Sequence, residues 1–147
     1  KYIFLKPWAC FEICFKTTSL FGCCIDICEW SKVSIGEDCM LSHDIKIYSN
    51  DCHTIFDLTT GKNINSTEEI CRQRNIYIGK HVWIGLGAVI LYGSRIEDGS
   101  IVGAESLVKG PVPGNCIVWG SPARITRRNV AWSRKNCADD LQMETCM

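Results

Sequence analysis

One stretch of the chain decides the fold: residues 78–108, which read IGKHVWIGLGAVILYGSRIEDGSIVGAESLV. An aliphatic residue recurs there at every sixth position, and a small or modest side chain stands four positions after each of the first five. The aliphatic positions are Ile78, Ile84, Ile90, Ile96, Val102 and Val108. The small positions are Val82, Ala88, Ser94, Ser100 and Ser106. The same spacing appears upstream in Ile35, Leu41 and Ile47.

A six-residue period fits neither an α-helix nor an ordinary strand, because their side-chain periods are ~3.6 and ~2 residues. Six residues suffice for one short strand and one corner, and three such units close a triangular coil of ~18 residues. Successive coils then stack at the ~4.8 Å spacing of neighbouring strands. This stacking places Ile78 under Ile96, Ile84 under Val102 and Ile90 under Val108. We therefore predict an all-β fold, a parallel β-helix.

The six-residue spacing breaks once. The slot that follows Ile47 is occupied by His53, and regular repeats resume only at Ile78. The residues between are polar and rich in Gly, Asn, Ser and Thr, which predicts an inserted loop of about residues 54–75 that leaves the coil and covers a site.

The two ends do not follow the repeat. The predicted regions are an N-terminal segment (1–32), a β-helix domain with the inserted loop (33–125) and a C-terminal tail (126–147). Apolar residues cluster at 8–11 and 13–15, which indicates a short helix that caps the open end of the coil. The tail from Arg127 is expected to be irregular or helical.

Composition excludes several classes. Sixteen Lys and Arg balance sixteen Asp and Glu, so no basic field favours nucleic acid. No stretch approaches the ~20 apolar residues of a membrane span, and we expect a soluble, cytoplasmic protein. Because the chain starts at Lys1 rather than Met, truncation or processing stays open.

Eleven cysteines require an explanation. Cys10 and Cys14, like Cys24 and Cys28, stand four residues apart and would share one face of a helix, which leaves a zinc site as an alternative. The odd total argues against a closed disulfide framework. We favour reduced thiols that act as small apolar fillers.

Three short segments resemble a known family. Residues 50–53 (Asn-Asp-Cys-His), 81–85 (His-Val-Trp-Ile-Gly) and 120–124 (Gly-Ser-Pro-Ala-Arg) are similar to those of hexapeptide-repeat O-acetyltransferases, in the branch that acts on polysaccharides or sugars. The resemblance implies a left-handed coil and a homotrimer with its active site between subunits. It also implies acetyl-CoA as the co-substrate and no metal.

By this resemblance His53 is the general base that takes the proton of the acceptor hydroxyl. Imidazole suits this role because its ordinary pKa lies near neutrality. A carboxylate that orients the ring would help, and Asp51, Asp57 and Asp44 are the nearby candidates. The sequence does not choose among them, although Asp51, two residues away, would share the face of His53 on a regular strand. Asp44, Asn50 and Asp57 are candidates for binding the acceptor. Each Asp is alternatively a turn residue that binds its own backbone.

Leu86 and Ala104 are 18 residues apart, so they belong to one column on adjacent coils. By family match they line the groove for the pantetheine arm, with Gly85 and Gly103 beside them. The remaining cofactor candidates are Trp83 near the thioester and Lys109, Arg124 and Arg127 at the phosphates, with Arg128 as a further cation.

Two other functions stay open. The γ-type carbonic anhydrases share this coil and hold zinc with three His. The histidines here are His43, His53 and His81, and their spacing differs from that family's pair of ligands five residues apart. A catalytically silent scaffold is the other alternative. The residues also leave the acceptor open: a hydroxyl of a sugar, polysaccharide, antibiotic or amino acid, or an amine.

Overall fold

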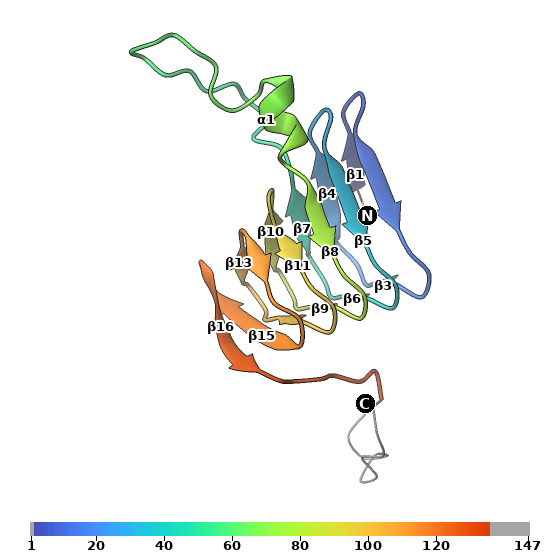
Figure 1. The fold of residues 1–147 in the computed structure, drawn as a ribbon. Coiled ribbons are helices and arrows are strands. Elements are labelled where there is room, and N and C mark those ends of the chain that lie inside the picture. Colours follow the sequence, from blue (N-terminus) through green and yellow to red (C-terminus); the bar gives the residue numbers. More distant parts are fainter. Residues whose placement is uncertain (1, 136–147) are drawn as a thin grey trace.

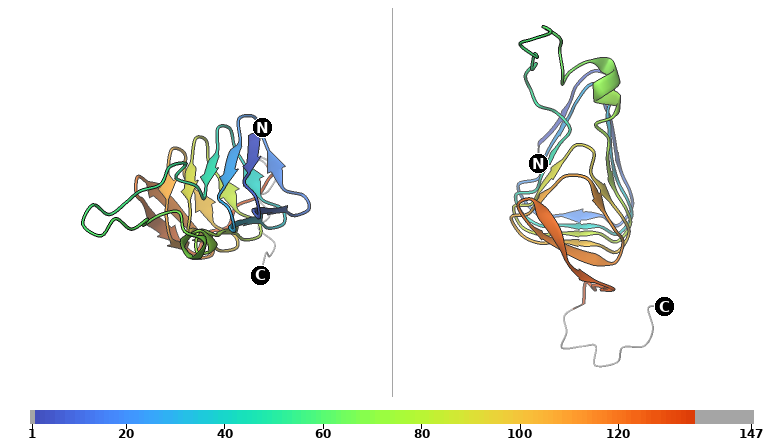
Figure 2. Two further views of the ribbon diagram at one scale, coloured as in Figure 1. Left: turned by 90° about the horizontal axis from the view of Figure 1, so that it is seen from above. Right: turned by 60° about the vertical axis from the view of Figure 1, so that its left-hand side comes forward.

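The computed structural model describes residues 2–135. Three parallel sheets form the sides of a prism around which the chain winds (Figures 1 and 2). Sheet A contains β1 (Tyr2–Leu5), β4 (Cys24–Ile27), β7 (Lys46–Tyr48), β10 (Val89–Leu91) and β13 (Leu107–Val108). Sheet B contains β2 (Cys10–Ile13), β5 (Lys32–Ile35), β8 (Ile76–Ile78), β11 (Arg95–Ile96) and β14 (Pro111–Val112). Sheet C contains β3 (Thr18–Ser19), β6 (Met40–Leu41), β9 (Trp83–Ile84), β12 (Ile101–Val102), β15 (Cys116–Gly120) and β16 (Ala123–Arg128).

The register confirms the predicted stacking. Ile78 pairs with Ile96, Ile84 with Val102 and Ile90 with Val108. All the aliphatic repeat positions are buried, and the small residues that follow them are buried at the corners. The core is thus a set of aliphatic columns, held together by ladders that run along the prism.

The coils before the loop are longer than the predicted ~18 residues. Strand partners in the first coils differ by 22 residue numbers, as in Tyr2 with Cys24 and Cys24 with Lys46. Strands β4 and β5 have four residues and alternate between half-buried and buried positions, so each directs two side chains inward. The ordinary two-residue period of a strand therefore replaces the six-residue period there.

The helix expected around residues 8–15 is wrong. Residues 2–19 form β1, β2 and β3, which pair with β4, β5 and β6 as a first coil. The apolar side chains of this coil stay exposed, among them Ile3, Leu5 and Ile13, because each stands at an inward position with a coil on one side only. These apolar residues are therefore the inward-facing positions of the first coil of the β-helix.

At the other end, β16 pairs antiparallel with β15, so residues 123–128 are a strand and no helix forms there. Residues 129–135 have no regular structure. The rest of the predicted tail, with Cys137 and Cys146, lies outside the described residues.

Between β7 and β8 the chain leaves the coil at the corner that joins sheets A and B (Figures 1 and 2). Ile47 pairs with Ile90, a difference of 43 residue numbers, so this one turn of the coil holds a large excursion. We call residues 49–75 the excursion. It contains α1 (Glu68–Arg72), a short helix whose N-cap Thr67 accepts a hydrogen bond from the backbone N–H of Ile70. No helix within residues 2–135 is long and apolar enough to cross a membrane.

Candidate active site

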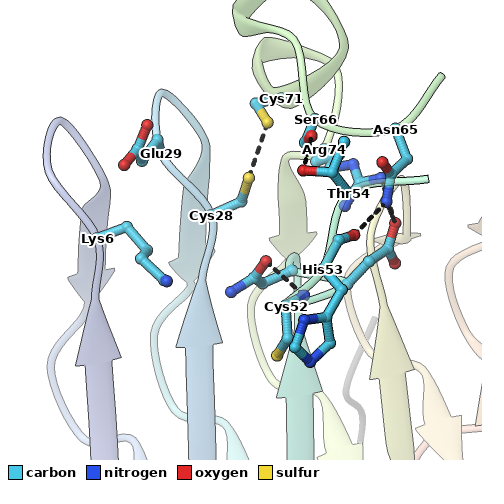
Figure 3. Close-up of a pocket in the computed structure, with 12 residues that line it drawn as sticks. Lys6, Cys28, Glu29, Cys52, His53, Thr54, Asn65, Ser66, Cys71 and Arg74 are labelled. Carbon is cyan, nitrogen blue, oxygen red and sulfur yellow. Dashed lines mark hydrogen bonds and ion pairs between the residues drawn. The ribbon is translucent and has the colours of Figure 1, made fainter. Parts of the chain in front are cut away.

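The excursion and the ends of the neighbouring coils enclose a cavity of about 240 Å³ (Figure 3). His53 lies at its wall, five residues after the end of β7. The lining residues come from the first coil, from the end of β4 and from the excursion: Lys6, Cys28, Glu29, Asn50, Asp51, Cys52, His53, Thr54, Asn65, Ser66, Cys71 and Arg74. The break in the six-residue repeat therefore coincides in the structure with the cavity beside the excursion.

Hydrogen bonds hold the backbone of His53 at both its N–H and its carbonyl. The His53 N–H donates to the Asp51 carbonyl at 2.8 Å, and the His53 carbonyl accepts from Asn65 Nδ2 at 2.8 Å. The ring points away from Asn65 and Arg74 in Figure 3. Within residues 2–135, no side chain is hydrogen-bonded to the imidazole. The exposed ring is thus available to an incoming hydroxyl.

Asp51 is engaged elsewhere. Its Oδ2 accepts from Arg74 Nη2 at 2.5 Å and from Asn65 Nδ2 at 3.1 Å. Partial burial alone would raise the pKa of this carboxyl, but the hydrogen bonds from Arg74 and Asn65 outweigh burial and hold that pKa below its ordinary value. Asp51 is therefore a carboxylate at neutral pH, and it faces a buried guanidinium.

Two thiols close the inner side of the cavity. Cys28, after β4, and Cys71, in α1, are buried with their Sγ atoms 2.9 Å apart. Burial, followed by the hydrogen bond with Cys71, raises the pKa of the Cys28 thiol to about 12. Cys28 is therefore protonated at neutral pH and is a poor nucleophile, since only the thiolate attacks.

Of the three candidates for acceptor binding, one lines the cavity and two lie outside it. Asn50 lines the cavity, although its Oδ1 accepts from the Cys52 N–H at 2.9 Å. Asp57 lies in the excursion, where the N–H and hydroxyl of Thr60 and the N–H of Thr59 bind its Oδ1; these bonds, Thr60 first, lower the pKa of Asp57. Asp44 is an exposed turn residue with φ 57°. The turn alternative thus describes the contacts of Asp57, and Asp44 also stands in a turn.

The cofactor candidates lie at another corner, where β9 of sheet C leads into β10 of sheet A. Leu86 and Ala104 occupy adjacent coils there, and both are exposed; the Glu105 N–H donates to the Leu86 carbonyl at 2.7 Å. A Cβ on Gly85 would lie 2.7 Å from the Ala104 nitrogen, so the glycine allows the coils to approach. Gly103 similarly gives room to Trp119.

The larger cofactor candidates are spread over two sides of the prism. Trp83 faces outward from β9 in sheet C, with its ring 6.0 Å from that of Trp132. Arg124 and Arg127 are exposed on β16 of the same sheet. Lys109 instead follows β13 of sheet A, and its Nζ lies 3.3 Å from the Tyr92 hydroxyl at the corner of the excursion. The structure thus separates Lys109 from the two arginines.

The three histidines do not converge. His81 Nδ1 lies 2.7 Å from Asp38 Oδ2 and its Nε2 lies 3.0 Å from the Trp132 carbonyl oxygen, so both ring nitrogens already have partners and one of these partners belongs to the C-terminal segment. Trp132 also stacks on the His81 ring at 4.1 Å. The zinc alternative requires His81 as a ligand, and this contact set opposes it.

Several residues of the site carried no recognisable signal in the sequence. Arg74, Asn65, Cys71 and Cys28 belong to no repeat or motif, and they meet His53 only because the excursion folds back onto the coil. Their types alone, a single Arg before a strand and an Asn in a polar stretch, are too common to indicate a site.

No protein-family model matches the chain. A polysialic acid O-acetyltransferase of Escherichia coli O1:K1 / APEC is 36% identical over 107 residues, which are 73% of this chain and 33% of the relative. A polysialic acid O-acetyltransferase of Neisseria meningitidis is 40% identical over 112 residues, which are 76% of this chain and 49% of the relative. The chain thus spans half or less of these relatives.

A crystallographically analysed polysialic acid O-acetyltransferase has a similar fold. It superposes with a TM-score of 0.78 at 36% identity, over 91% of this chain and 63% of that one. Sequence and fold agree with each other and with the repeat and motifs described above. The chain therefore belongs to the hexapeptide-repeat O-acetyltransferase family and has its left-handed parallel β-helix.

Proposed function

We propose that the chain transfers the acetyl group of acetyl-CoA to a hydroxyl of an acidic polysaccharide, with His53 as the general base. The observation that carries the proposal is the position of His53. Its imidazole is exposed at a cavity wall, with its backbone held at both the N–H and the carbonyl and its ring unpartnered by any side chain of residues 2–135. The similarity to polysialic acid O-acetyltransferases supports the reaction class.

His53 would move one proton. As the hydroxyl oxygen bonds to the acetyl carbonyl carbon, the imidazole takes the hydroxyl proton. The carbon–sulfur bond then breaks, and the imidazolium returns the proton to the departing thiolate. We take the transfer to be direct, without an acyl-enzyme. Burial and the hydrogen bond with Cys71 raise the pKa of the Cys28 thiol to about 12, so this thiol is not a nucleophile at neutral pH. Such a base contributes about 10²–10⁴-fold in rate.

For the donor, the best candidates are the adjacent coils at Gly85–Leu86 and Gly103–Ala104. A ligand that lies along exposed backbone needs small side chains beside it, and the glycines supply them. Arg124 and Arg127, exposed on β16 of the neighbouring sheet, are the cations that we assign to the phosphates.

The active form that fits these positions is a homotrimer. His53 lies at the corner between sheets A and B, whereas Leu86 and Ala104 lie at the corner between sheets C and A. Within one subunit, sheet A separates the two corners (Figure 2). Packing three prisms around an axis would bring the His53 corner of one subunit to the groove of the next.

The acceptor side offers two exposed cations. Lys6 lines the cavity, and Lys109, whose Nζ lies 3.3 Å from the Tyr92 hydroxyl, helps to lower the pKa of Asp51 through its charge. Carboxylates of an acidic glycan suit such positions, which agrees with the acceptor named for the relatives. Asn50 is the neutral cavity residue that we assign to the sugar hydroxyls.

The test is transfer of radiolabelled acetyl from acetyl-CoA to polysialic acid, followed by chromatography of the glycan. A thiol reagent would be misleading here, because Cys10, Cys14 and Cys52 are exposed. We expect wild-type transfer, and a loss of at least ~100-fold in His53→Ala with acetyl-CoA binding retained. Unchanged transfer in His53→Ala would reject the base. Acetyl-CoA binding without transfer to any acidic or neutral glycan would favour the silent scaffold.

A further inference from the structure

Arg74 is a buried cation at the returning end of the excursion, between α1 and β8. The residue is 4% exposed, and its guanidinium has partners from three places. Nη2 binds Asp51, Nη1 donates to the Ser49 carbonyl at 3.4 Å, and the group lies 4.4 Å from the centre of the Tyr92 ring. Ser49 and Asp51 belong to the departing end of the excursion, so Arg74 joins its two ends.

A short chain of hydrogen bonds leads from Arg74 to His53. Asp51 Oδ2 accepts from Arg74 and also from Asn65 Nδ2. The same Asn65 Nδ2 donates to the His53 carbonyl, and Asn65 Oδ1 accepts from the Ile55 N–H at 2.6 Å. Asn65 is 6% exposed, so these bonds are shielded from water. The path ends at the His53 carbonyl and the Ile55 N–H, both on the C-terminal side of the His53 Cα.

This backbone path matters because no side chain of residues 2–135 is hydrogen-bonded to the ring. The direction of the imidazole then depends on where the backbone of residues 51–55 is held. That segment lies outside the β-ladders, where few contacts oppose local opening. Misplacing a catalytic group by ~1 Å can reduce the rate ~10²-fold.

We propose that Arg74 is the positioning residue of the base: through Asp51 and Asn65 it holds the His53 backbone so that the imidazole meets the acceptor. The proposal rests on the proposed function, in which His53 is the base. Arginine is required because one planar group must bind two acceptors in different directions and lie against Tyr92; an ammonium cannot reproduce this geometry.

A role in binding the glycan is the competing interpretation of Arg74. Its side chain is 5% exposed and its Nη2 already binds Asp51, whereas Lys6 and Lys109 are exposed. The lysines are therefore better placed to meet acceptor carboxylates. The two interpretations differ in kinetics: a positioning residue changes kcat, and an acceptor ligand changes the KM for the glycan.

The experiment compares Arg74→Lys with Arg72→Lys in the full chain, using acetyl-CoA and polysialic acid. Arg72 is the matched control, because it is the exposed last residue of α1, two positions before Arg74, and its ion pair within residues 2–135 is with Glu68. We expect Arg74→Lys to lower kcat about 100-fold, with the KM for the glycan within about twofold of wild type. Arg72→Lys should leave both constants unchanged.

A double mutant separates positioning from general loss of structure. In the His53→Ala background, Arg74→Lys should cause no further loss, since there is no base left to position. An equal loss in both backgrounds would overturn the proposal, as would a raised KM for the glycan with normal kcat. If Arg74→Lys does not fold, Asn65→Ala tests the last link, and a folded Asn65→Ala enzyme with wild-type kcat would also overturn it.

The outcome for His53 is independent of the outcome for Arg74. If His53→Ala keeps full activity, the proposed function fails whatever Arg74 does. If His53→Ala is inactive while Arg74→Lys has wild-type kcat, the assignment of His53 as the base is kept and only the positioning role of Arg74 is rejected.

Discussion

Replacing Ile84 with Ala tests whether the six-residue repeat builds the interior. Ile84 is 0% exposed on β9, and its in-register neighbours Leu41 and Val102 are buried as well. The substitution removes three carbons, worth about 2.5 kcal/mol at ~0.8 kcal/mol for each buried methylene. The ladders on both sides prevent collapse, so a cavity remains, and the total loss should be about 3–4 kcal/mol.

The assay is urea unfolding followed by far-ultraviolet circular dichroism, at two protein concentrations because assembly shifts the midpoint. Leu58→Ala is the control, since Leu58 in the excursion is fully exposed; its effect should stay within about 0.5 kcal/mol. A loss of less than about 1 kcal/mol for Ile84→Ala, or equal losses for both variants, would refute the assignment of Ile84 to a packed column.

Three further predictions follow from individual contacts. Gly85→Ala should weaken acetyl-CoA binding and lower the melting temperature, because its Cβ would meet the Ala104 nitrogen at 2.7 Å; calorimetry measures the first and thermal unfolding the second. The free energy of unfolding should fall as the pH drops below about 4, because the pKa of Asp51 is lower in the folded protein than in the unfolded chain, so protons bind the unfolded chain more tightly. Urea titrations at several pH values measure this fall, and Asp51→Asn should make it smaller. Trp132→Ala should release residues 129–135, because the ring stacks on His81 and its Nε1 donates to the His81 carbonyl; faster hydrogen exchange there would show it, and unchanged exchange would contradict it.

The fold after the excursion was predictable from the sequence because each coil repeats the same pattern of inward and corner residues. An inward aliphatic residue and a small corner residue must recur in phase for coils to stack, as Ile78 and Ile96 do. The first coil was not predictable in this way. Its longer strands direct two residues inward, and the inward Phe11 and Ile13 of β2 belong to a local apolar cluster that is also compatible with a helix.

For the candidate site, the sequence could indicate His53, since it interrupts the repeat where an aliphatic residue is due. It could not choose the partner of Asp51. Spacing along a strand suggested that the carboxylate shares the face of the imidazole, but the chain leaves the strand before Asp51, and the carboxylate turns to Arg74.

The sequence by itself therefore determined the periodic part of this protein: the β-helix, the inward columns and the position at which the coil opens. Only the tertiary structure decided what surrounds His53, because Asn65, Cys71 and Arg74 reach it through an excursion whose path no local period describes. Local repetition fixes a stacked coil through contacts between neighbouring turns. A site formed by a returning loop depends on long-range contacts between single residues, and these become visible only when the chain is folded.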